Sequence, residues 1–179
     1  MRVYLDNNAT TPLRDEVKQA ITEFLPYFGN PGSLHEDGRE ARMRIDRARE
    51  QVAVFFGAPV DDLVFTSSGS EANNTVLKSV LYKSYDFTPH VIVSNIEHPS
   101  VLETARFLQK RGVDVTFLPV RDNGVIDIGD LESALKKETV LVSIMCANNE
   151  IGTIQPVREI GTILRERNIF FHTDAVQTP

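Results

Sequence analysis

The sequence contains only one cysteine, Cys146, among its 179 residues. A single cysteine excludes both an internal disulfide framework and the paired cysteine spacing of a zinc ribbon. The chain also has no apolar run long enough to cross a bilayer, and the stretch from Met1 to Asp6 lacks the apolar segment of a secretory signal. These absences predict a cytoplasmic protein that does not enter a membrane.

Positive charge is scarce as well. The chain carries 19 lysine and arginine residues against 25 aspartate and glutamate residues, which gives a net charge of -6. Proteins that bind nucleic acid or anionic membranes present basic patches, so we expect no nucleic-acid partner. The hydrophobic content of 41% and the charged content of 25% are ordinary for a globular protein. The length suits one domain or a piece of a larger one.

Apolar runs alternate with helical patterns over most of the chain. The expected strands are 63–66, 90–94, 113–118, 139–145 and 169–173, and the expected helices between them are 70–83, 99–111, 130–137 and 156–167. This alternation predicts an α/β fold with three layers, α/β/α, around a mainly parallel sheet. Two amphipathic helices precede it, and the second, Glu36 to Phe56, is expected to be long.

Small and polar residues follow four of the expected strands. Ligands of open α/β sheets bind outside the carboxyl ends of the strands, so these residues are expected to form one site. The segments concerned are Ser67–Glu71, Asn95–His98, Cys146–Glu150 and Asp174–Gln177.

Gly69 and Ser70 open a helix, where free backbone N–H groups and the positive end of the helix dipole attract a phosphate. The alternative is a serine that caps the helix, with Glu71 in its first turn and no ligand. Asp174 stands at the mouth of a buried strand and needs a partner, because a bare carboxylate is costly to desolvate. The protonated ring nitrogen of pyridoxal phosphate is such a partner, and a structural ion pair is the alternative.

Three further side chains suit the same cofactor. His98 can stack on a flat ring or move protons near neutral pH, or else bond to backbone at a helix start. Asn149 and Gln177 can bond to a phenolic ring oxygen, or else serve in turns and caps. Cys146, by contrast, ends a buried strand and is interpreted as a packed small hydrophobe.

Six motifs, spread in order from one end of the chain to the other, resemble those of the cysteine desulfurases of the NifS/IscS type. These enzymes have the class V aminotransferase fold, the fold type I of pyridoxal phosphate enzymes. The motifs are YLDNNATTP (4–12), GNPGSLHEDGREAR (29–42), FTSSGSEANN (65–74), EHPSV (97–101), ANNEIGTIQP (147–156) and HTDAVQT (172–178).

The resemblance implies a role for each candidate residue. Gly69 and Ser70 hold the cofactor phosphate, His98 stacks on the ring and assists proton transfer, Asn149 contacts the ring oxygen and the substrate, Asp174 pairs with the pyridine nitrogen, and Gln177 bonds to the ring oxygen. The resemblance also places Asn7, Ala9 and Thr10 near the substrate entrance, with Asn30 and His35 as further contributors.

The resemblance implies a reaction and partners too. Such an enzyme converts L-cysteine to alanine and holds the sulfur as a persulfide on its own cysteine. The sulfur then passes to acceptor or scaffold proteins for iron–sulfur cluster or thio-cofactor assembly, and the enzyme is a homodimer. A selenocysteine lyase activity stays open.

The chain departs from the family after its last motif. The Ser-x-His-Lys stretch that carries the cofactor-binding lysine is absent, and Cys146 does not match the sulfur-accepting position. Residues 1–179 are therefore interpreted as an N-terminal segment plus the front part of the large cofactor domain, without the small C-terminal domain. Alone, the chain is expected to be inactive and to bind the cofactor weakly.

Two other functions remain open on the residues alone. One is a metal-dependent hydrolase that uses His172, Asp174 and the pair Glu97–His98 as ligands. The other is a non-catalytic scaffold that binds a partner chain.

Overall fold

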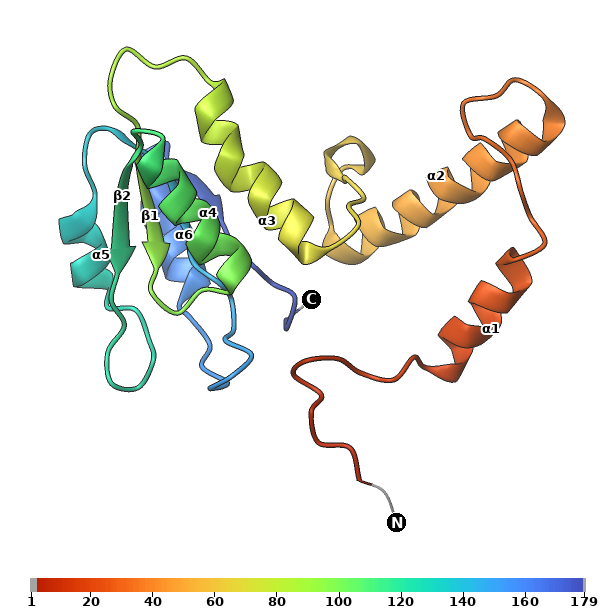
Figure 1. The fold of residues 1–179 in the computed structure, drawn as a ribbon, viewed down its shortest axis with the longest axis horizontal. Helices are drawn as coiled ribbons and strands as arrows, with labels where there is room; N and C mark the ends of the chain where they lie inside the picture. Colours follow the sequence, from red (N-terminus) through yellow and green to blue (C-terminus); the bar gives the residue numbers. More distant parts are fainter. Residues whose placement is uncertain (1–2, 179) are drawn as a thin grey trace. The chain divides into compact units, whose positions relative to one another are not determined.

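The computed structural model describes residues 3–178, which divide between Phe65 and Thr66 into two compact units (Figure 1). In this part of the chain no helix has both the length and the apolar character needed to cross a membrane.

The first unit is built from two helices and a short 3₁₀ turn. α1 spans Asp15–Phe24, α2 spans Glu36–Phe56, and the turn η1 spans Val60–Asp62. The His35 ring caps the start of α2 by accepting a hydrogen bond from the Gly38 N–H at 3.3 Å. Gly57 ends it in the left-handed conformation, with a φ of 63° that glycine tolerates. The prediction of a long helix from Glu36 to Phe56 is confirmed.

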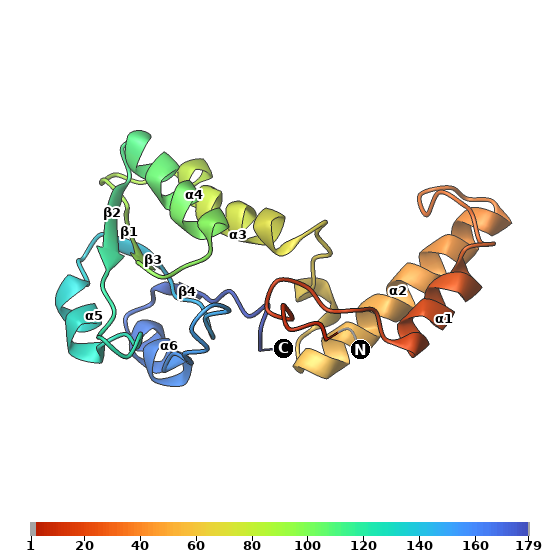
Figure 2. The same cartoon turned by 60° about the horizontal axis from the view of Figure 1, so that its bottom comes forward.

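The second unit contains a parallel sheet. Its strands are β1 (His90–Ser94), β2 (Asp114–Leu118), β3 (Thr139–Ser143) and β4 (Phe170–His172), in the order β2-β1-β3-β4. All three strand pairings are parallel, and Figure 2 shows the strands side by side. The predicted parallel sheet is confirmed.

Helices cover both faces of this sheet, as the two views show (Figures 1 and 2). Helices α3 (Gly69–Lys78) and α4 (Pro99–Lys110) pack on one face, and α5 (Ile128–Ala134) and α6 (Val157–Glu166) pack on the other. Alternate residues of β1 serve the two faces: Val91 and Val93 belong to the first core and Ile92 to the second. The three-layer prediction therefore holds for this unit.

The expected strand at residues 63–66 was wrong. The segment is irregular and has no ladder partner within residues 3–178. Val64 is 77% exposed and Phe65 50% exposed, so burial does not hold these apolar side chains in a sheet. Strand-forming residues make a strand only where a neighbour accepts their backbone hydrogen bonds. Gly69 and Ser70 consequently follow a loop rather than a strand.

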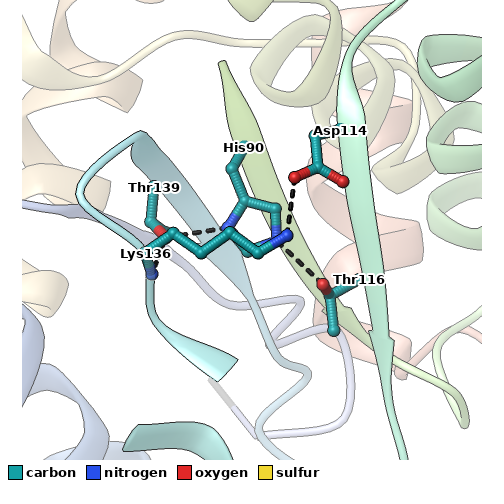
Figure 3. A network of polar contacts seen from close by, with 5 residues as sticks. All are labelled: His90, Asp114, Thr116, Lys136 and Thr139. Carbon is teal, nitrogen blue, oxygen red and sulfur yellow. Dashed lines mark hydrogen bonds and ion pairs between the residues drawn. The ribbon is translucent and has the colours of Figure 1, made fainter. Parts of the chain in front are cut away.

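A buried histidine joins the amino ends of three strands (Figure 3). The His90 ring contacts the hydroxyls of Thr139 and Thr116, each at 2.8 Å. Thr139 Oγ1 also accepts a hydrogen bond from the Lys136 N–H at 2.8 Å, so this hydroxyl links the ring to the loop before β3. Burial, and then the charge of Lys136, lower the pKa of His90, although Asp114 partly opposes them. The ring is therefore neutral, and both of its nitrogens have hydrogen-bond partners.

Candidate functional site

The site lies at the carboxyl ends of the strands, where the order of the sheet reverses. From β1 the chain crosses to β2 on one side, and it later returns to place β3 on the other side of β1. At such a switch point the loops after the two central strands diverge and leave a crevice for a ligand. His98 follows β1 and Asn149 follows β3, so both residues lie on loops at this point.

These two loops are tied together by side chains. Glu97 Oε1 accepts hydrogen bonds from the Met145 N–H at 2.8 Å and from the Ser94 hydroxyl at 2.5 Å. The Asn148 amide donates to the Ile96 carbonyl at 2.9 Å. The loop that carries His98 and the loop that carries Asn149 are therefore held in one arrangement.

Glu97 is the most perturbed acid of the site. Burial raises its pKa to about 7, the hydrogen bonds from Ser94 and Met145 oppose that rise, and the nearby charge of Asp174 adds to it. Its Oε2 atom is buried and has no hydrogen-bond partner within residues 3–178. The sequence suggested Glu97 only as a metal ligand. Its position in the sequence, between strand β1 and the start of a helix, was the available indication that this acid is buried.

Asp174 is held in a defined orientation. Its backbone carbonyl accepts the Cys146 N–H at 2.9 Å, which continues the pairing of β3 and β4. Its Oδ1 accepts the Val176 N–H at 3.1 Å, and its Oδ2 accepts the Asn73 side-chain amide at 2.8 Å. The carboxylate is thus anchored from two directions without a cationic side chain among these donors.

The start of α3 faces the segment that follows Asp174. A Cβ atom at Gly69 would come within 3.1 Å of the Val176 side chain, so only glycine fits there without a shift. The helix is capped by Ser68, whose hydroxyl accepts the Glu71 N–H at 3.2 Å, and not by Ser70. Ser70 therefore lies in the first turn, beside the free N–H groups of the helix start.

Glu71 completes this cap. Its carboxylate accepts hydrogen bonds from the backbone N–H and the hydroxyl of Ser67, at 2.6 and 2.7 Å. These bonds lower the pKa of Glu71. The acid in the first turn thus bonds to the residue before the serine cap, which agrees with the alternative interpretation of a capping serine with Glu71 in the first turn.

His98 caps α4 and is linked to Asp174. Its Nδ1 accepts the Ser100 N–H at 3.1 Å and lies 2.7 Å from the Ser100 hydroxyl. The Asn73 amide donates to the same hydroxyl at 2.9 Å. The sequence-based prediction missed Asn73 and Ser100. The available signal was that Asn73 stands four residues after Gly69, on the same face of α3.

The structure thus places the sequence-predicted residues as follows. Ser70, His98 and Asp174 belong to segments joined by hydrogen bonds through α3, and Gly69 lies next to Val176. Asn149 follows Asn148, which fixes the loop after β3. Gln177 lies in the turn after Asp174.

A metal site has no support in this region. No group of three or more His, Cys, Asp and Glu side chains within residues 3–178 is arranged to hold a metal ion. His172 Nδ1 is 2.8 Å from the Ser143 hydroxyl, and burial lowers the pKa of the ring, with Asp174 opposing. The metal-dependent alternative therefore lacks a ligand set here.

Comparison with known proteins agrees with this geometry. The sequence pattern of the family described as Aminotransferase class-V matches residues 3–179. The cysteine desulfurase IscS of Dictyoglomus turgidum is 51% identical over 177 residues, which cover 98% of this chain and 45% of that protein. The cysteine desulfurase IscS of Methanosarcina thermophila is 46% identical over 179 residues, covering 98% of this chain and 44% of that protein.

Solved structures of similar proteins share this fold. A NifS-like protein superimposes with a TM-score of 0.94 at 42% identity, over 99% of this chain and 50% of the other. SspA in complex with cysteine superimposes with a TM-score of 0.93 at 38% identity, over 98% of this chain and 51% of the other. The chain spans about half the length of the relatives it matches.

Proposed function

The chain belongs to the aminotransferase class V family, and from that premise we propose that it provides the cofactor-binding half of a pyridoxal-phosphate-dependent cysteine desulfurase. The observation that carries the proposal is the Asp174 carboxylate. It is oriented by Asn73 and by the Val176 N–H at the carboxyl end of β4, beside the glycine that opens α3.

The residues present fit pyridoxal phosphate. A carboxylate that only neutral N–H groups anchor keeps its charge uncompensated, and a protonated ring nitrogen compensates it. The N–H groups at the start of α3 and the Ser70 hydroxyl form a donor set for a phosphate. When bound, the cofactor supplies an electron sink for bond cleavage at the substrate.

Each side chain then has a task that its place supports. Asp174 holds a proton on the ring nitrogen, and Gly69 and Ser70 bind the phosphate. His98 stacks on the ring and moves protons at its Nε2 atom. Asn149 and Gln177 bond to the ring oxygen, and Asn149 also contacts the substrate.

The proposed substrate is L-cysteine, which the whole enzyme converts to alanine. The sulfur is retained as a persulfide and delivered to acceptor or scaffold proteins of iron–sulfur assembly, by a cytoplasmic homodimer. The support is indirect: two similar relatives carry the name IscS cysteine desulfurase, and one structural neighbour, SspA, was solved in complex with cysteine.

The 179-residue chain alone is proposed to lack this activity. Neither the Ser-x-His-Lys stretch with the cofactor-binding lysine nor a cysteine at the sulfur-accepting position occurs in it. The check is an assay of sulfide and alanine release from cysteine with added cofactor. Turnover that Asp174→Ala abolishes, in a preparation free of longer enzyme, would contradict the proposed inactivity.

Cofactor binding tests the site directly. We expect Asp174→Ala to weaken the binding of pyridoxal phosphate to this chain by about tenfold or more, because a charged contact is lost. The matched control is Asp86→Ala, which removes an exposed aspartate from the loop before β1 and leaves the affinity unchanged. The measurement is a titration followed by cofactor absorbance. Equal affinities of the Asp174→Ala variant and the parent chain would contradict the assigned site.

A further inference from the structure

We propose that Asn73 is a positioning residue that joins the Asp174 carboxylate and the His98 ring into one directed chain of hydrogen bonds. The proposal rests on the proposed function for its catalytic meaning, although the hydrogen bonds themselves do not depend on a cofactor. This series of hydrogen bonds runs from Asp174 through Asn73 and Ser100 to His98.

Asn73 is buried and reaches two other elements. It is 4% exposed and lies on α3, one turn after the helix start. Its Nδ2 atom is 2.8 Å from Asp174 Oδ2, in the segment after β4, and 2.9 Å from Ser100 Oγ, in the first turn of α4. An amide with both hydrogens in use is rigid, and leaving either acceptor without its donor is costly in a buried site.

The direction of each bond follows from the chemistry of the groups. A carboxylate only accepts, so the side of the Asn73 amide that faces Asp174 is its NH₂ group. The second hydrogen of that group goes to Ser100 Oγ. The Ser100 hydroxyl directs its own proton to His98 Nδ1, because that nitrogen is an acceptor. The Ser100 N–H donates to the same ring nitrogen.

The tautomer of His98 follows from these directions. With two donors aimed at Nδ1, the neutral ring must carry its proton on Nε2. His98 is therefore set to donate a proton from Nε2, while its accepting nitrogen is occupied by Ser100. Asn73 thereby orients the carboxylate at one end of these hydrogen bonds and, at the other, holds the Ser100 hydroxyl that donates to His98 Nδ1.

If Asn73 only held α3 against α4, the loss of another hydrogen bond between these helices would have the same effect as the loss of Asn73. The interface of α3 and α4 contains a second, partly buried hydrogen bond, from the Thr104 hydroxyl to the Asn74 side chain at 3.0 Å. Thr104→Val removes that bond at nearly constant volume without contacting His98 or Asp174. It is the matched control for packing of these two helices.

The test uses nuclear magnetic resonance of the histidine ring nitrogens and the aspartate carboxyl carbons in the 179-residue chain without cofactor. In the parent chain, His98 Nδ1 should resonate as an unprotonated nitrogen and Nε2 as a protonated one. Ser100→Ala removes the hydroxyl donor and keeps the Ser100 N–H donor, so it should shift the Nδ1 signal while Nδ1 stays unprotonated, and leave the Asp174 carboxyl signal in place. Asn73→Leu should shift both signals, and Thr104→Val should shift neither.

The opposite results overturn the proposal. These are a His98 that carries its proton on Nδ1 in the parent chain, an Nδ1 signal that Ser100→Ala leaves unchanged, or equal spectra for Asn73→Leu and Thr104→Val. Ser100→Ala keeps the test decisive if Asn73→Leu does not fold, because it removes only the Ser100 hydroxyl and its contacts with His98 and Asn73. A separate titration with pyridoxal phosphate should show about tenfold weaker binding for Asn73→Leu. If no variant or parent binds the cofactor while the spectra behave as expected, the proposed function fails and the hydrogen-bond chain stands.

Discussion

At the scale of single residues, Glu97 shows how burial changes an acid. The side chain is 4% exposed, and one of its oxygens accepts two hydrogen bonds while the other has no partner among the described residues. Burial favours the protonated form, so the folded protein holds a proton on Glu97 at a pH at which the unfolded chain has lost it.

This gives a prediction about pH and stability. The pKa of Glu97 rises from 4.5 to about 7 on folding, so the free energy of unfolding falls as the pH rises through that window. Glu97→Gln keeps the accepting oxygen and removes the titration. Relative to the parent, we expect the variant to gain about 2–3 kcal/mol between about pH 4.5 and pH 8. Urea unfolding over that range measures the difference.

The parent chain and the Glu97→Gln variant must be compared, because buried histidines change the free energy of unfolding with pH in the opposite direction to Glu97. The pKa values of His90 and His172 are lowered by burial, so their stabilising contribution is lost as the pH falls below about 6.5. These contributions cancel in the difference between parent and variant. A difference that does not change with pH would contradict the buried, protonated Glu97.

At the scale of elements, the amino ends of the strands depend on the His90 group. Thr139→Val removes the acceptor of the Lys136 N–H and the hydroxyl partner of His90 Nδ1 (Figure 3). Two buried polar groups lose a partner, so we expect a loss of about 2–4 kcal/mol in the free energy of unfolding. Thr162→Val removes only an exposed intrahelical bond and should change stability by less than about 0.5 kcal/mol. Equal effects would mean that the His90 contacts contribute little.

Alanine substitutions at two helical glycines are predicted to have opposite effects, one stabilising and one destabilising. A Cβ atom at Gly161 in α6 would lie 3.6 Å from the Phe171 ring, in ordinary contact, so Gly161→Ala should stabilise the second unit by about 0.5–1 kcal/mol. A Cβ atom at Gly38 in α2 would lie 2.5 Å from the Ser33 carbonyl oxygen. Gly38→Ala should therefore loosen the loop before α2.

Hydrogen exchange distinguishes the two glycine variants. Amides of residues 33–39 should exchange faster in Gly38→Ala, because the loop must move away from the helix. Those of α6 should exchange more slowly in Gly161→Ala. Unchanged exchange in the loop would show that it accommodates a methyl group without a shift.

At the scale of the whole molecule, the two units differ in what they bury. Both apolar cores consist of residues after Thr66, and none of the described α1 side chains is buried. The residues assigned to the cofactor all lie in the second unit as well. That unit contains its own sheet, its helices on both faces, and the hydrogen-bond chain from Asp174 to His98.

A shorter chain therefore tests the division. We expect residues 66–179 to fold cooperatively and to bind pyridoxal phosphate with an affinity within about threefold of the 179-residue chain, since the assigned donors are all retained. Thermal unfolding and an absorbance titration measure both. Loss of binding in a folded 66–179 chain would show that the first unit contributes to the site.

The sequence by itself determined the fold class, the long helix Glu36–Phe56 and the family, because periodicity and local motifs are short-range properties of the chain. It failed at residues 63–66, where β-forming side chains had no neighbouring strand. Only the tertiary structure decided that Asn73 and Ser100 connect Asp174 to His98, and that Glu97 is a buried acid joining the loops after β1 and β3. These partners are separated by up to 101 residues along the chain, and folding alone brings them within hydrogen-bonding distance.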